Sequence, residues 1–111
     1  MKEHMDLLVR GAQILVYKCG QTKPGDKVLI IADSSTKKIA GYLLQTARQI
    51  SDDVKFMMAK QAKMHGVEPS SEIAEAMLDS DVIFGLTRFS MAHTKARLEA
   101  TRRGARYLSL P

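Results

Sequence analysis

The pattern of apolar and polar residues along this chain predicts strands and helices in alternation. The first strand-like block, KVLIIAD (27–33), is apolar without every-second-residue alternation. Such a run is typical of a strand that is buried on both faces, as in a parallel sheet. Three further blocks have the length and composition of strands: DVKFMMA (53–59), DVIFGLT (81–87) and ARYLSL (105–110).

Apolar residues that recur at helical spacing predict four helices around these strands. The first covers residues 5–19, and the second follows Thr36 and ends near Gln49. The third is capped by Ser70 or Ser71, and the fourth covers residues 93–103 and ends at Gly104. The residues predicted to form buried helix faces are Leu8, Ala12, Leu15 and Cys19; Ile39, Leu43, Ala47 and Ile50; Ile73, Ala74, Met77 and Leu78; and Ala92, Ala96 and Ala100.

This order of elements predicts one α/β domain over residues 1–111. Right-handed crossovers convert it into a four-stranded parallel sheet with helices on both faces, a Rossmann-like or flavodoxin-like sandwich. Ligands of such sheets bind at the carboxyl ends of the strands, near the switch in strand order. Two polar segments, 33–36 and 87–94, leave those ends, and we expect them to be neighbours if the first and third strands are adjacent. Gly85 in the third strand predicts that another group packs closely against it.

The composition limits the cellular compartments and the classes of partner that we expect for this chain. Of the 111 residues, 45% are hydrophobic, which predicts a folded chain, and no apolar run approaches the ~20 residues of a membrane span. The first residues carry charges where a secretion signal has an apolar segment. Cys19 is the single cysteine and cannot form an internal disulfide. We therefore expect a cytoplasmic protein without a membrane partner.

The charge balance is basic, with 17 Lys and Arg against 12 Asp and Glu, for a net charge of +5. A basic chain can bind nucleic acid. Here the basic residues are scattered and barely interleaved with aromatic residues, so no nucleic-acid partner is expected.

Known phosphate and metal motifs are missing from the sequence. No GxGxxG and no Walker lysine loop follows the first strand. Asp33 lacks the additional acidic residues with which a phosphoacceptor holds magnesium. We interpret the oxygens of 33–36 as helix caps, with a small-anion site as the alternative. His4, His65 and His93 are far apart, so no metal site is expected within this chain.

His93 is the strongest candidate for chemistry. It begins a predicted helix beside Thr94, four residues before Arg97 and shortly after Arg88 and Ser90. A helix N-terminus favours the neutral imidazole, which can accept a proton. Arg88 and Arg97 could hold a carboxylate or bind a partner domain. The alternative is a histidine that caps the helix or bonds to a neighbouring backbone group.

Three stretches resemble a known family: KPGDKVLIIAD (23–33), EPSSEIAEAMLDSDVIFGLT (68–87) and SMAHTKARLEATRRGARYLSLP (90–111). They are similar to the N-terminal domain of the aminopeptidase T-like (leucyl aminopeptidase) metallopeptidases, which are related to the iron-dependent 2,5-dihydroxypyridine dioxygenases. The last stretch is the most specific part of the resemblance. Its matching residues are Ser90, His93, Thr94, Ala96, Arg97, Gly104, Ala105, Arg106 and Pro111.

The resemblance implies a supporting role rather than catalysis by this chain alone. In the family the metal ligands lie in a C-terminal domain, so two divalent metal ions, Zn or Co, are expected there and no cofactor is expected in this chain. The N-terminal domain is implied to wall the substrate cavity and to help assemble a dimer. Of its pattern, the cavity-facing residues carried over are Ser90, His93, Thr94 and Arg97, and Arg88 joins them by position.

Three alternatives stay open. The chain could instead be the N-terminal domain of a ring-cleaving iron dioxygenase, since the metal ligands that would distinguish the two enzymes are expected beyond Pro111. An independent α/β module could bind a small anion or a nucleotide through segments 33–36 and 87–94. A purely structural interaction domain is the third possibility.

Overall fold

The computed structural model describes residues 10–19, 21–60, 68–87 and 94–109. Its centre is a four-stranded parallel sheet with the strand order β2-β1-β3-β4. The strands are β1 (Val28–Ala32), β2 (Val54–Met58), β3 (Val82–Gly85) and β4 (Arg106–Ser109). The helices are η1 (Ile14–Cys19), α2 (Lys37–Arg48), α3 (Ser71–Leu78) and α4 (Lys95–Arg102). The predicted α/β fold of the Rossmann or flavodoxin type is confirmed.

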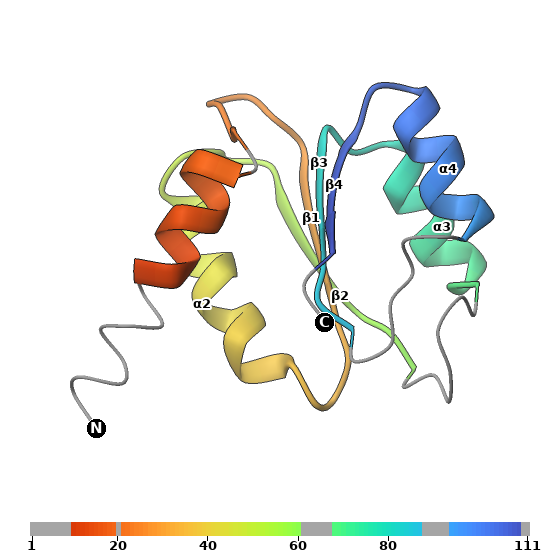
Figure 1. Cartoon of the computed structure of the whole chain (residues 1–111), viewed down its shortest axis with the longest axis horizontal. Helices are drawn as coiled ribbons and strands as arrows, with labels where there is room; N and C mark the ends of the chain where they lie inside the picture. Colours follow the sequence, from red (N-terminus) through yellow and green to blue (C-terminus); the bar gives the residue numbers. More distant parts are fainter. Residues whose placement is uncertain (1–9, 20, 61–67, 88–93, 110–111) are drawn as a thin grey trace.

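Helices cover both faces of the sheet (Figure 1). The first helix, residues 10–19, begins as an α-helix and continues as the π-helix η1, and it lies with α2 on one face. Helices α3 and α4 lie on the other face. Successive residues of β1 therefore enter two different cores. Val28 and Ile30 pack toward the first helix and α2, whereas Leu29 and Ile31 pack toward α3 and α4.

Burial of β1 explains why its sequence lacks alternation. All five of its residues are buried, and at most 2% of any of them is exposed to solvent. The edge strand β2 is only half-buried, and Met58 at its end is exposed. A central parallel strand thus requires apolar residues on both faces, as the sequence predicted, and an edge strand tolerates Lys55.

Two predicted helix boundaries are confirmed by their local geometry. The Ser70 side chain accepts a hydrogen bond of 3.3 Å from the backbone N–H of Ile73 and so caps α3. Helix α4 ends before Gly104, whose φ of +99° lies in the left-handed region that favours glycine. The start of α4 differs slightly from the prediction, because Thr94 is the cap and the helix begins at Lys95.

The predicted buried faces are largely correct where they can be compared. Leu43 and Ala47 are buried in α2, but Ile39 is 47% exposed, so that prediction is wrong. Ala40 takes the buried position in the first turn and leaves the Ile39 side chain in solvent. Ala12, Ile73, Met77, Ala96 and Ala100 are buried as predicted, whereas Ile50, Ala74 and Leu78 are only half-buried. The predictions for Leu8, Ala92 and the side chains of Leu15 and Cys19 lie outside the described residues.

Within the described part of the chain, none of the helices has both the length and the apolar character that crossing a membrane requires.

Candidate functional site

The switch in strand order falls between β1 and β3. From β1 the chain crosses through α2 to β2 on one side, and from β3 it crosses through α4 to β4 on the other. Ile31 pairs with Gly85, and the backbone N–H of Leu86 donates to the Ile31 carbonyl at 2.8 Å. Asp33 and Thr87 therefore leave adjacent strands at one edge, as predicted. Ligands of parallel sheets bind at this kind of edge.

Segment 33–36 builds a turn at this edge. An oxygen of the Asp33 carboxylate, Oδ1, accepts hydrogen bonds from the backbone N–H and the hydroxyl of Ser35. The Thr36 hydroxyl oxygen accepts a bond of 3.1 Å from the backbone N–H of Asp33. Thr36 precedes α2 but makes no side-chain capping bond. The interpretation of these oxygens as helix caps is therefore wrong for Thr36, whose hydroxyl bonds within the turn.

The start of α4, in contrast, is fully capped by side chains. The Thr94 hydroxyl accepts a bond of 3.2 Å from the backbone N–H of Arg97. The Glu68 carboxylate accepts bonds of 2.8 Å from the N–H of Lys95 and 3.2 Å from the N–H of Ala96. The first three N–H groups of α4 thus have acceptors, one of which is charged, as a helix N-terminus favours. This helix start offers none of those three amides to an external anion.

Arg97 lies half-buried behind this cap. The carbon of its guanidinium group is 5.8 Å from the centroid of the Tyr107 ring on β4, within the range of a cation–π contact. Its Nε is buried and has no hydrogen-bond partner in the described part of the chain. Among the described residues, Arg97 is therefore positioned by an aromatic ring and forms no ion pair with a carboxylate.

The position of Tyr107 depends on Gly85, two residues along β3 from its pairing partner Ile83. A Cβ atom on Gly85 would overlap the hydroxyl and ring carbons of Tyr107. The close approach that the sequence predicted at Gly85 is confirmed, and the approaching group is Tyr107. Gly85 thus allows the tyrosine ring to lie along the sheet toward the carboxyl end of β3.

The structure places two of the five predicted site residues. Thr94 is fully buried and caps α4, so any contribution that it makes to a ligand site acts through the position of this helix. Arg97 follows it on the same helix. Ser90, His93 and Arg88 lie outside the described residues.

Glu68 and Tyr107 were not anticipated as neighbours of this region. Glu68 is 27 residues from the amide that it caps, and no local pattern links the two. Tyr107 lies in an apolar strand, where its partner Arg97 is set by packing of α4 on β4.

Polar groups at the opposite edge of the sheet hold the strands together. Arg106 forms an ion pair of 2.8 Å with Asp26, and Lys27 forms one of 3.3 Å with Asp79. The Asp81 carboxylate accepts a bond of 2.8 Å from the backbone N–H of Lys27. These charges act within the fold, which leaves the carboxyl edge as the better candidate for a ligand.

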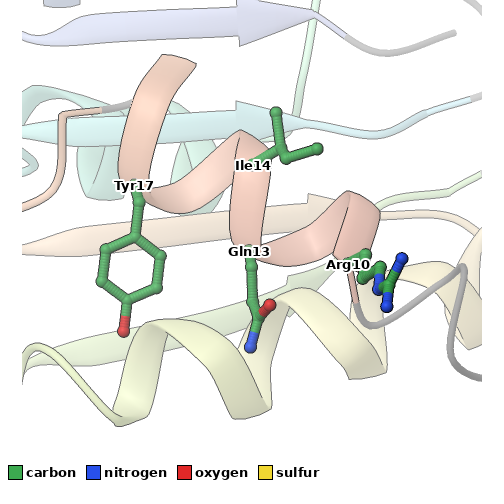
Figure 2. Close-up of a pocket in the computed structure, with 4 residues that line it drawn as sticks. All are labelled: Arg10, Gln13, Ile14 and Tyr17. Atoms are coloured by element: carbon green, nitrogen blue, oxygen red, sulfur yellow. The ribbon is translucent and has the colours of Figure 1, made fainter.

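A surface hollow of about 320 Å³ lies on the first helix (Figure 2). Gln13 and Tyr17 project to the same side of that helix. Tyr17 and Ile14 are about half exposed. The hollow is on the first helix and not at the strand ends, and the residues that line it are Arg10, Gln13, Ile14 and Tyr17.

Across residues 10–19, 21–60, 68–87 and 94–109, no group of three or more His, Cys, Asp or Glu side chains could hold a metal ion. The described residues therefore do not fit a metal centre of their own.

No protein-family model matches this chain, and significant matches were found neither among curated proteins nor among solved structures.

Proposed function

We propose that this chain is the N-terminal domain of a cytoplasmic, aminopeptidase T-like metallopeptidase, in which it walls the substrate cavity and supports a homo-oligomer without being catalytic alone. The observation that carries the proposal is the adjacency of β1 and β3. It brings segment 33–36 and Thr87, the first residue of segment 87–94, to one edge of the sheet. The resemblance of residues 90–111 to that family supplies the enzyme class.

The burial of Thr87 and Thr94, the two described ends of segment 87–94, supports this role. Thr87 and Thr94 bound the part of the chain that carries Arg88, Ser90 and His93, and both threonines are buried. Thr94 is fixed further by its bond to α4. A wall that positions substrate needs such fixed ends, because catalysis requires the reacting groups to be held in place.

Catalytic metal would belong to the other domain of the intact enzyme. Two divalent metal ions, Zn or Co, would supply an activated water for attack on the peptide bond. His93 would orient the substrate or carry a proton, and Arg97 would hold a negatively charged group beside it.

The alternative of an anion- or nucleotide-binding module is weakened by Glu68. Its carboxylate already occupies the amides at the start of α4 that a phosphate would use. An entering phosphate would have to displace a charged group of the protein itself. The start of α4 is thus a poor site for a phosphate group.

The proposal is tested by asking whether the chain binds a substrate-like amide without hydrolysing it. The purified chain is titrated with L-leucine amide and, separately, with inorganic phosphate, and hydrolysis of the amide is followed with Zn or Co added. We expect L-leucine amide to bind and to remain intact relative to a metal-only control. Hydrolysis by the chain alone would contradict the proposed division of labour, and binding of phosphate but not of the amide would favour the alternative module.

A further inference from the structure

We propose that Arg97, lying over the ring of Tyr107, forms a binding site for a monoanionic carboxylate. This inference deepens the proposed function and rests on it for the role of Arg97 in holding a negative charge, but it concerns only residues of this chain and needs neither a metal ion nor a second domain. The ligand class is a small molecule with one free carboxylate group.

The first argument is that Arg97 has no internal acceptor. Among the described residues its Nε is buried without a hydrogen bond, and the ion pairs of this part of the chain do not include it. Two other arginines are satisfied within the fold: Arg102 pairs with Glu99 at 3.0 Å, and Arg106 pairs with Asp26 at 2.8 Å. A buried donor without an acceptor is unfavourable, so an acceptor that reaches Arg97 gains binding energy.

The second argument is that the guanidinium is already positioned. Its carbon lies 5.8 Å from the centroid of the Tyr107 ring. That ring is held in turn, because its hydroxyl lies where a Cβ of residue 85 would be, against the backbone of Gly85. A planar group that a rigid ring holds in place loses little freedom when it binds a ligand.

The third argument selects a carboxylate over a phosphate. The paired N–H donors of a guanidinium match the two oxygens of one carboxylate. A phosphate dianion is usually bound by several cations or by free amides at a helix start. Here the amides of Lys95 and Ala96 are taken by Glu68, and its negative charge lies beside the same helix turn. A single negative charge with two oxygens is therefore the best match.

The position of the site fits a ligand at the carboxyl edge. Arg97 is the third residue of α4, whose N-terminus follows the carboxyl end of β3. Tyr107 pairs with Ile83, and its hydroxyl reaches Gly85, the last residue of β3. A carboxylate on Arg97 thus lies at the same end of the sheet as Asp33 and Thr87.

The test compares three probes: a carboxylate, its neutral amide and inorganic phosphate. The full chain is titrated with N-acetyl-L-leucine, with its neutral amide N-acetyl-L-leucinamide, and with inorganic phosphate. The Nε–H resonance of Arg97, identified by its loss in the Arg97→Lys variant, is followed by NMR. We expect N-acetyl-L-leucine to shift this resonance in a saturable way, and we expect the amide and phosphate to leave it in place.

Variants with matched controls extend the test. Arg97→Lys keeps the charge and loses the paired donors, so we expect about tenfold weaker binding of N-acetyl-L-leucine. Tyr107→Leu removes the ring, and we expect about threefold weaker binding. Arg102→Gln is the control, because Arg102 lies on the same helix but is exposed and already paired, and we expect unchanged affinity.

Four results would overturn the proposal. They are an Nε–H resonance that no carboxylate shifts, an equal response to the neutral amide, a response to phosphate alone, and full affinity in Arg97→Lys. If the Arg97→Lys variant fails to fold, the Nε–H resonance is assigned in the unmodified chain through its scalar couplings to the Arg97 backbone, and its response still decides the matter. Loss of binding by L-leucine amide with retained binding of N-acetyl-L-leucine would sink the proposed function and leave this site standing.

Discussion

The carboxylate of Glu68 accepts a hydrogen bond of 2.8 Å from the backbone N–H of Lys95, so a residue just before α3 closes the start of α4. A second bond, from the N–H of Ala96, makes the contact bidentate. Together with the cap from Thr94, it fixes the helix that carries Arg97. The candidate ligand edge therefore includes a helix start whose backbone N–H groups bond to side chains of the protein itself.

Removal of the Glu68 carboxylate is expected to destabilise the fold. Glu68→Ala leaves two helix N–H groups without their charged acceptor, which costs about 1 kcal/mol of unfolding free energy. Glu68→Gln keeps one oxygen acceptor, so its loss is expected to be about half as large. Urea denaturation measures both, and an unchanged midpoint for Glu68→Ala would contradict the contact. Glu75→Ala, at an exposed position of α3, is the control and is expected to stay within about 0.5 kcal/mol.

Thr94 is expected to contribute to stability rather than to ligand contact. Thr94→Val keeps the side-chain volume and removes the oxygen that caps α4, which costs about 1 kcal/mol. Because the native hydroxyl is fully buried, the folded variant should bind L-leucine amide with unchanged affinity. Thermal unfolding and titration of the same sample test the two statements. A stable variant with lost binding would instead place Thr94 in direct contact with the ligand.

A methyl group at position 85 is expected to be harmful. Gly85→Ala would place its Cβ into the hydroxyl and ring of Tyr107, and overpacking of this kind costs about 1–3 kcal/mol. The double variant Gly85→Ala with Tyr107→Leu should recover part of that loss, since the second change removes the clashing ring. Denaturation of the two single variants and the double variant measures the coupling. Additive losses would contradict the contact.

The same glycine-to-alanine substitution at position 41 is expected to stabilise the fold. Gly41 lies inside α2, and nothing lies within 4 Å of the position where its Cβ would be. Gly41→Ala should therefore stabilise the fold by about 0.5–1 kcal/mol, through better helix propensity and a less flexible unfolded chain. Thermal unfolding compares it with Gly85→Ala, and a destabilised Gly41→Ala would show that α2 packs more tightly there than the structure indicates.

The fold was predictable because local signals and burial agree. Apolar runs marked the strands, Ser70 and Gly104 marked helix ends, and the helix–strand order determined a parallel sheet. The prediction for Ile39 was wrong because helical spacing alone does not say which residue of the first turn faces the sheet. In the structure Ala40 is the buried residue of that turn. Helix periodicity thus locates a buried face only to within about one residue.

The candidate site was predictable only in part, because its contacts join distant segments. Arg97 could be selected as a cation near a helix start, but its contact with Tyr107 depends on the packing of α4 against β4. The bond from Lys95 to Glu68 spans 27 residues and leaves no mark in either local pattern. Such contacts follow from topology rather than from the residues' own neighbours.

The most direct test of the central claim is residue-resolved NMR of the isotope-labelled chain during titration with L-leucine amide. We predict that the backbone signals of Asp33–Thr36 and Thr87 shift together, since β1 and β3 bring them to one edge. Signals at the opposite edge, such as those of Lys27 and Asp81, should stay unchanged. Shifts confined to that opposite edge, or to the first helix around Tyr17, would contradict it.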